Sequence, residues 1–353
     1  MHLPTPDLDI ISQVVDNYGD AGIAYRLARS WQLYHPQAVV RVIIDDLLLL
    51  SRLCPSIDPQ REEQLIQGIL YVDRRSKILQ ALRPAPLVIR LHESTLPDIY
   101  ADRAHSESQI ILVLPGLTAQ AWAQAIHGTE SLNAHHARTF FFVSGFLPKT
   151  GGLLMSTCLP VSPRPVLQDK FVVLFSYEFS AEPLINALAN ASLTLMVCGE
   201  RTQAMVRQIQ HTPNNLRIVY PHFMSQESFD ALLCQSELNF VRGEDSLVQA
   251  IGAGKPFLWQ IYPQDDLAHL AKLSAFLSIL EPYFENPTLF ENYRWLTHYY
   301  NGLEEGSASR VAESVFVFIE NLATIKLSVE RFRGAISQHG TLIDRLIELI
   351  KTI

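Results

Sequence analysis

The sequence predicts an α/β protein built from two halves, each organised around a parallel sheet. Short apolar runs rich in β-branched residues alternate with helical patterns through most of the chain, which is typical of parallel strands joined by crossover helices. The chain has 353 residues, of which 48% are hydrophobic, and this suits two cores better than one. A turn-rich stretch at 148–152 and a proline cluster at 160–165 mark the boundary between the halves.

The expected strands fall into two series. The first series is Ile10–Val15, Val39–Ile44, Ile69–Val72, Leu87–Leu91, Ile110–Leu114 and Thr139–Val143. The second is Phe171–Phe175, Leu193–Val197, Leu216–Val219, Leu238–Val241 and Pro256–Trp259. Near the end of the chain, apolar residues recur at helical spacing from Leu342 to Ile350, which predicts a helix. The apolar face of this helix must pack against another part of the protein. We expect a first domain over residues 1–158, a second over 159–328, and a segment 329–353 that returns to the first.

Composition and charge exclude several classes of function. Lys plus Arg number 28 and Asp plus Glu number 36, and the net charge of -8 argues against nucleic acid as a partner. A basic protein partner is compatible with this charge. The four cysteines form no C-x-x-C pair, so no zinc site is indicated. The first residues carry Asp7 and Asp9 where a signal peptide would be apolar, and no apolar run is long enough for a membrane span. We therefore expect a soluble cytoplasmic protein.

The loop after the first strand carries two carboxylates. Asp16, Asn17, Tyr18, Gly19 and Asp20 follow the strand directly, and a helical pattern follows them. One interpretation is a turn in which Asn17 and Gly19 adopt left-handed backbone and Asp20 caps the helix. The other is that both carboxylates act on a nucleophile or a cation at the carboxyl end of the sheet, where ligands bind. A tyrosine and acids stand where a G-x-G-x-x-G fingerprint would need small residues, so an ordinary NAD enzyme is disfavoured.

A second unusual loop follows strand Leu238–Val241. Arg242 supplies a planar donor fork for phosphate oxygens, and Gly243 allows the backbone to approach a ligand. Ser246 and the free amides of the next helix could bind a diphosphate. The alternative takes Ser246 as an N-cap, with Glu244 and Asp245 complementing the helix dipole, but leaves Arg242 unexplained.

Polar side chains also follow the last expected strand. Gln264 and Asp265 could hold sugar hydroxyls through hydrogen bonds. The residues by themselves thus indicate a two-domain transferase that binds a diphosphate sugar.

Four long motifs resemble the EarP family of glycosyltransferases. They are V-V-D-N-Y-G-D-x-G-x-x-x-R-L-A-R at Val14–Arg29, F-x-P-x-T-G-G-L-L at Phe146–Leu154, L-N-F-V-R-G-E-D-S-x-V-x-A at Leu238–Ala250, and A-G-K-P-F-x-W-Q-I-Y-P-Q-D-D-x-A-H-x-x-K-L-x-A-F-L at Ala253–Leu277. The resemblance implies the GT-B fold, with two Rossmann-like domains facing a central cleft. It also implies an inverting reaction without metal or other cofactor, with dTDP-β-L-rhamnose as donor and an arginine of translation elongation factor P as acceptor.

The resemblance assigns roles to matching positions. Asp16 and Asp20 would be the acceptor-side carboxylates, with Asp20 the general base, and Glu244 is counted with them as catalytic although its own role is open. Asn17, Tyr18 and Gly19 belong to the same acceptor-side loop. The residues that would hold the donor are Phe175, Tyr177, Phe223, Gln226, Phe229, Arg242, Asp245 and Ser246, with Gln226 at the edge of the base.

One segment differs from the family pattern. Leu112–Gln120 contains no acid, whereas family members usually carry two glutamates there. Two alternatives stay open beside rhamnosylation of the elongation factor. One is transfer of a different nucleotide sugar to a different acceptor, and the other is a member that binds the factor without transferring sugar.

Overall fold

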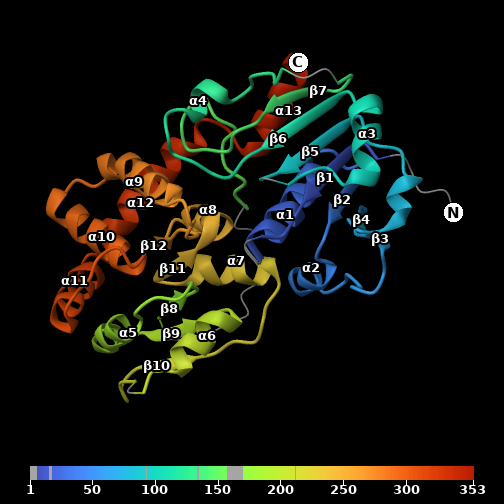
Figure 1. Cartoon of the computed structure of the whole chain (residues 1–353). Coiled ribbons are helices and arrows are strands. Elements are labelled where there is room, and N and C mark those ends of the chain that lie inside the picture. The colour runs from blue at the N-terminus through green and yellow to red at the C-terminus, as the bar shows by residue number, and fades with distance from the viewer. Residues whose placement is uncertain (1–5, 16–17, 93, 133–134, 157–169, 211) are drawn as a thin grey trace. The chain divides into compact units, whose positions relative to one another are not determined.

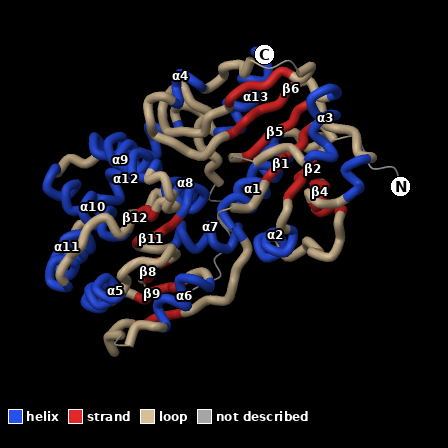
Figure 2. Tube along the Cα trace, in the orientation of Figure 1, coloured by secondary structure: helices blue, strands red, loops and turns tan. Residues whose placement is uncertain are grey.

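The computed structural model describes residues 6–353 except 16–17, 93, 133–134, 157–169 and 211 (Figure 1). The chain divides into two compact units, one formed by residues 1–154 with 339–353 and the other by residues 155–338. Each unit contains one sheet, and Figure 2 shows the strands of both in red. Within the described part, no helix combines the length and apolar character that a membrane crossing needs.

The first unit has a seven-stranded sheet in the order β3-β4-β2-β1-β5-β6-β7. Every pairing is parallel except that of the edge strand β3 with β4. The strands are β1 (Leu8–Ser12), β2 (Val40–Ile44), β3 (Glu63–Ile66), β4 (Ile69–Asp73), β5 (Leu87–Leu91), β6 (Ile110–Leu114) and β7 (Arg138–Phe141). The helices are α1 (Tyr18–Tyr34), α2 (Leu47–Leu53), the 3₁₀ turn η1 (Lys77–Gln80), α3 (Asp98–Glu107), α4 (Ala123–Ile126) and α13 (Leu342–Thr352).

The second unit has a five-stranded parallel sheet in the order β10-β9-β8-β11-β12. Its strands are β8 (Phe171–Leu174), β9 (Thr194–Val197), β10 (Arg217–Val219), β11 (Leu238–Arg242) and β12 (Phe257–Gln260). Its helices are α5 (Glu182–Leu188), η2 (Ala189–Ala191), α6 (Glu200–Arg207), α7 (Gln226–Gln235), α8 (Gly243–Ala253), α9 (Ala268–Leu280), η3 (Glu281–Tyr283), α10 (Pro287–Tyr300), α11 (Ala308–Glu320) and α12 (Leu322–Ser337).

Both sheets have the strand order of a Rossmann fold. Counted along the chain within the second unit, the order is 3-2-1-4-5, and without β3 the first unit reads 3-2-1-4-5-6. Ligands of such sheets bind beyond the carboxyl ends of the strands, where the order reverses. The predicted α/β class with two Rossmann-like halves is therefore confirmed, and the loops after β1 and β8 lie at the two reversal points.

The predicted strands match the observed ones best where they are uninterrupted apolar runs. β5 and β6 have the predicted bounds, whereas β1 ends at Ser12 and not at Val15. β3 was not predicted, because this edge strand contains polar residues and is short. The extra strand closes the sheet beside β4 through an antiparallel hairpin.

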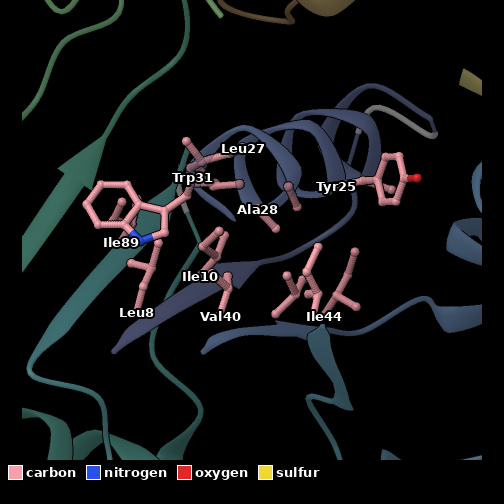
Figure 3. Close-up of a cluster of buried hydrophobic side chains, with 14 of the residues drawn as sticks. Leu8, Ile10, Tyr25, Leu27, Ala28, Trp31, Val40, Ile44 and Ile89 are labelled. Atoms are coloured by element: carbon pink, nitrogen blue, oxygen red, sulfur yellow. The ribbon is translucent and has the colours of Figure 1, made fainter. Parts of the chain in front are cut away.

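Helix α1 covers the centre of the first sheet. Figure 3 shows the apolar side chains of this helix facing those of the strands. The labelled residues of this cluster are Tyr25, Leu27, Ala28 and Trp31 on the helix, with Leu8, Ile10, Val40, Ile44 and Ile89 on the strands. The cluster fixes α1, and hence its first turn, against the carboxyl end of β1 by burial of apolar surface.

Helix α13 completes the core of the first unit. Leu342, Ile343 and Leu346 are buried in the same cluster as side chains of β6 and β7. A capping box between Thr341 and Asp344 begins the helix. The predicted returning segment was 329–353, whereas in the structure residues 339–353 group with the first unit. Residues up to Gln338 belong to the second unit, because α12 packs against α8 there.

A buried ion pair joins β1 to β2. Arg41 donates to Asp9 through Nε at 2.8 Å and through Nη2 at 2.6 Å, and also to the carbonyl of Arg83. Asp9 accepts further hydrogen bonds from the amide of Ala85 and the hydroxyl of Tyr100. Burial, and then the Asp9 charge, raise the pKa of Tyr100 well above its usual range, so its hydroxyl stays a donor. The network satisfies a charge pair that has no access to water.

We expect Asp9→Ala to lower the free energy of unfolding by about 3–5 kcal/mol, because it leaves the Arg41 charge buried without its partner. Urea unfolding followed by circular dichroism measures this loss. Asp102→Ala on the exposed side of α3 is the matched control and should change stability by less than about 0.5 kcal/mol. Equal effects of the two substitutions would contradict the role given to the pair.

Candidate active site

The backbone that follows β1 is held by side chains from neighbouring elements. The amide of Gln13 donates to Ser94 Oγ at 2.8 Å, and that of Val14 donates to Asp45 Oδ1 at 3.0 Å. Ser94 follows β5 and Asp45 follows β2, the two strands that flank β1. These bonds replace the sheet partners that the amides lose where the strand ends. The path of the chain into the first loop is therefore fixed as far as Val15.

Asp20 is buried in the first turn of α1. Its Oδ2 accepts a hydrogen bond of 2.7 Å from the amide of Val15, and its Oδ1 lies 2.7 Å from Nδ1 of His92. The residue is 7% exposed, so its carboxylate is largely removed from water. A negative charge at this position is stabilised by the amino end of the helix. The carboxylate is thus held in place at the carboxyl end of β1, where a base could act.

The other residues predicted in this loop lie partly outside the described residues and partly in the first turn of α1. Asp16 and Asn17 lie outside the described residues. Tyr18 begins α1, and its hydroxyl accepts a hydrogen bond from Arg52. Gly19 lies within the first turn of the helix and has no positive φ, so the turn with left-handed Gly19 is a wrong interpretation.

Arg242 ends β11 and is stacked on two aromatic rings. Its Cζ lies 4.5 Å from the ring centre of Phe175 and 4.6 Å from that of Tyr177, and Nη1 donates to the carbonyl of Ser176. The residue is only 6% exposed. A planar guanidinium gains from such stacking in a dry environment, which a lysine ammonium could not reproduce. The aromatic residues that follow β8 thus orient the donor fork at the end of β11.

Helix α8 begins directly after Arg242. Gly243 has a φ of +68°, a left-handed conformation that residues with a side chain rarely adopt. Arg242 is the residue before the helix, so the interpretation of Ser246 as an N-cap is wrong. Ser246 is instead buried in the first turn, near the amides that have no partner within the helix. The carbonyl of Gly243 accepts a hydrogen bond from Trp259 Nε1, which fixes the start of α8 against β12.

The acids of α8 are paired. Asp245 accepts hydrogen bonds from Gln226 Nε2 at 3.2 Å and from Gln249 Nε2 at 3.3 Å. Glu244 Oε1 lies 3.5 Å from Nζ of Lys272 in α9. These contacts connect α7, α8 and α9 around the first turn of α8. Within the described residues, no group of three His, Cys, Asp or Glu side chains could hold a metal ion.

Further aromatic side chains lie beside Phe175 or in the segment before α7. Phe229 of α7 packs edge-on against Phe175, with ring centres 5.2 Å apart, and Phe223 is 41% exposed in the segment before α7. The hydroxyl of Tyr300 donates to the carbonyl of Phe175. Burial raises the pKa of Tyr300 well above its usual range, although Arg242 acts in the opposite direction, so this hydroxyl stays neutral. The set offers ring faces and edges on which a planar base could stack.

Gln264 and Asp265 lie in the segment between β12 and α9. The backbone amide of Gln264 donates to Nδ1 of His269 at 3.0 Å, which fixes the backbone of this segment against the start of α9. Asp265 is exposed, so its carboxylate can be reached from solvent. On the second unit, the described contacts bring Arg242 together with Phe175 and Tyr177, Phe175 with Phe229, and Gln226 with Asp245. For Gln264 and Asp265 the structure shows a place between β12 and α9.

Three residues were not anticipated. His92 contacts Asp20, Lys272 contacts Glu244, and Gln260 Oε1 accepts a hydrogen bond of 2.7 Å from the amide of Tyr177. His92 directly follows the predicted strand Leu87–Leu91, so the rule that ligands bind after parallel strands was a signal for it. Lys272 and Gln260 both belong to the motif at Ala253–Leu277, but the residues they contact are found only in the structure.

Comparison with known proteins identifies the family. The family described as elongation factor P (EF-P) rhamnosyltransferase EarP matches residues 8–351. The chain belongs to this family. Its EarP relatives named protein-arginine rhamnosyltransferase include one from Pseudomonas aeruginosa, 33% identical over 77% of this chain and 81% of its own length. A relative of the same name from Pseudomonas putida is 35% identical over 76% of this chain and 80% of its own length.

Solved structures agree on the fold. One that describes EarP-mediated arginine glycosylation of EF-P superposes with a TM-score of 0.62 at 20% identity, over 98% of both chains. The spinosyn forosaminyltransferase SpnP superposes with a TM-score of 0.57 at 12% identity, over 99% of both chains. Like other EarP family members, the chain is a glycosyltransferase with the GT-B fold.

We expect Gly243→Ala to lower the free energy of unfolding by about 1–2 kcal/mol, because a Cβ is strained at this positive φ. Thermal unfolding followed by circular dichroism measures the change. Gly334→Ala is the matched control, since Gly334 lies within α12 and an added Cβ would meet nothing within 4 Å. That control should raise stability by about 0.5–1 kcal/mol, and the same sign for both variants would contradict the expectation.

Proposed function

We propose that the chain transfers L-rhamnose from dTDP-β-L-rhamnose to the guanidinium of one arginine of translation elongation factor P, with inversion at C1. The observation that carries the proposal is the family match over residues 8–351. The modification would activate the factor for rescue of ribosomes stalled at polyproline. Because the acceptor is a translation factor, we propose a cytoplasmic location, and the net charge of -8 suits an acceptor that presents a cation.

The acceptor requires a base close to its nitrogen. A guanidinium is protonated at neutral pH, and delocalisation makes its nitrogens weak nucleophiles. We propose that Asp16 and Asp20 bind the guanidinium, and that Asp20 takes a proton as the nitrogen attacks C1. The held carboxylate of Asp20 supports this assignment, because a base must be positioned before its strength matters. Asn17, Tyr18 and Gly19 would shape the acceptor-side loop.

Departure of dTDP from the donor requires groups that stabilise negative charge on its phosphate. As the new C–N bond forms, the bond from C1 to the phosphate oxygen breaks and its electron pair leaves with dTDP. We propose that Arg242 and the amides at the start of α8 stabilise this charge, with Asp245 and Ser246 holding the donor. Phe175, Phe223 and Phe229 would surround the thymine, and Tyr177 would contact the sugar side. Two carboxylates and an arginine are sufficient for this chemistry, so we propose no metal or other cofactor.

Three further residues are proposed for the donor. Gln226 would contact the edge of the thymine, and Gln264 and Asp265 would bind sugar hydroxyls. Glu244, which lies beside Lys272 at the start of α8, is proposed as a further catalytic residue on the donor side.

Incubation of elongation factor P with the chain and dTDP-β-L-rhamnose should add one deoxyhexose, measured by intact mass. Asp20→Asn should slow the transfer by roughly 10²- to 10⁴-fold, the usual contribution of a general base. Asp7→Asn, an exposed acid of the same unit, is the matched control and should leave the rate unchanged. A factor whose acceptor arginine is replaced by lysine should gain no mass. Transfer at full rate by Asp20→Asn would contradict the proposed base.

We expect Arg242→Lys to weaken the binding of dTDP roughly tenfold, because an ammonium loses the stacked fork and about one charge-assisted hydrogen bond. Isothermal titration calorimetry with dTDP measures this. Arg310→Lys is the matched control, since Arg310 stacks on Trp295 at 5.0 Å but lies on α11. Tighter binding of UDP than of dTDP by the unsubstituted chain would favour a different nucleotide sugar.

A further inference from the structure

We infer that His92 is a positioning residue for Asp20 and keeps its carboxylate aimed for proton transfer. This inference rests on the proposed function of Asp20 as the base. It adds a residue from a different strand of the sheet to the machinery of the first unit.

The position of His92 follows from the sheet. His92 directly follows β5, which pairs in parallel with β1, so the ends of the two strands lie at one edge of the sheet. The amide of His92 donates to the carbonyl of Leu114, the last residue of β6, at 2.7 Å. The backbone at His92 is therefore fixed by a strand that does not itself carry the base.

The two oxygens of Asp20 are held by different segments of the chain. Oδ2 accepts a hydrogen bond from the amide of Val15 after β1, whereas Oδ1 lies 2.7 Å from His92 Nδ1 after β5, a close polar contact that lacks the geometry of a hydrogen bond. With one contact alone, the carboxylate could still rotate about its Cβ–Cγ bond. Two contacts from two directions fix its plane, and each oxygen keeps a lone pair for a proton. The contact is an ion pair when the imidazole is protonated.

The backbone conformation of His92 is a second, independent observation. Its φ is +51°, in the left-handed region that glycine adopts freely and that side chains make unfavourable. Strain of this kind persists where the surrounding structure uses the residue, and it is concentrated at functional sites. A glycine here would relieve the strain but would remove the contact to Asp20.

The chemical consequence concerns the rate of the reaction and not the affinity for the donor. A general base acts only when its oxygen and the proton are within hydrogen-bond distance in the reacting complex. A carboxylate that samples several orientations is correctly aimed for a smaller fraction of the time. Loss of His92 should thus lower kcat and leave the KM for the nucleotide sugar unchanged.

The experiment compares two substitutions that both suit the left-handed backbone. His92→Gly removes the side chain, whereas His92→Asn keeps a nitrogen donor on Cγ, in the place of Nδ1, and tolerates positive φ. Transfer of rhamnose to elongation factor P is measured by intact mass over time. His92→Gly should lower kcat about 10- to 100-fold, as misplacement of a catalytic group does. Its KM for dTDP-β-L-rhamnose should stay within about twofold. His92→Asn should recover most of the lost rate.

Gln67→Gly is the control for the backbone. Gln67 also has a φ of +51°, and it lies in the turn between β3 and β4, so the substitution relieves the same strain. Its kcat should equal that of the unsubstituted chain. Thermal unfolding of all three variants shows whether they fold.

The outcomes separate the inference from the proposed function. A folded His92→Gly variant with unchanged kcat would overturn the positioning role while the proposed function stands. The positioning role would also be wrong if His92→Asn is as slow as His92→Gly, because the nitrogen donor would then not matter. If the unsubstituted chain transfers no rhamnose to the factor, the proposed function is wrong, and the positioning role is wrong with it.

Discussion

The pairing of Asp9 with Arg41 is the constraint on which the first unit depends. The two residues are direct partners in the register of β1 with β2, and their side chains are bound to each other at two points. A shift of the register by one residue would turn each side chain to the other face of the sheet. Such a shift would separate two charges that have no water to solvate them. The register of the two central strands is thus specified by charge as well as by apolar packing.

The position of Asp20 follows from that register. With β1 fixed against β2 and β5, the strand ends at Ser12, and the next amides meet Ser94, Asp45 and Asp20. In the second unit, a charged side chain is also held at the carboxyl end of the sheet, but by different contacts. There the cation itself ends a strand, and rings that follow the neighbouring strand β8 hold it. In both units, a parallel sheet supplies a rigid edge on which one charged group is oriented.

Much of the fold could be predicted from sequence, because buried parallel strands are continuous apolar runs. β5 and β6 were predicted to the residue for this reason. The end of β1 was misplaced because Val14 and Val15 look like strand residues, although their amides bind the side chains of Asp45 and Asp20. Periodicity also could not show that α12 packs on α8, since that helix could equally have covered either core.

The sequence predicted which strands the candidate residues follow, but not which side chains they contact. Both loops were found because the carboxyl ends of parallel strands meet at one edge. The contact of His92 with Asp20 joins residues far apart in the chain, and no local pattern encodes it. Ser246 was considered as an N-cap because serine favours that position, but Gly243 starts the helix earlier by adopting positive φ.

The discontinuity of the first unit affects how the protein is made. Its core is completed by α13, yet residues 339–353 leave the ribosome only after the whole of the second unit. At the usual speed of translation, the residues 155–338 in between take roughly 10 to 40 s to synthesise. During that interval the sheet of the first unit lacks the helix that covers part of its apolar face. The segment made first is therefore finished last, and a nascent chain that stops before α13 exposes the surface that chaperones recognise.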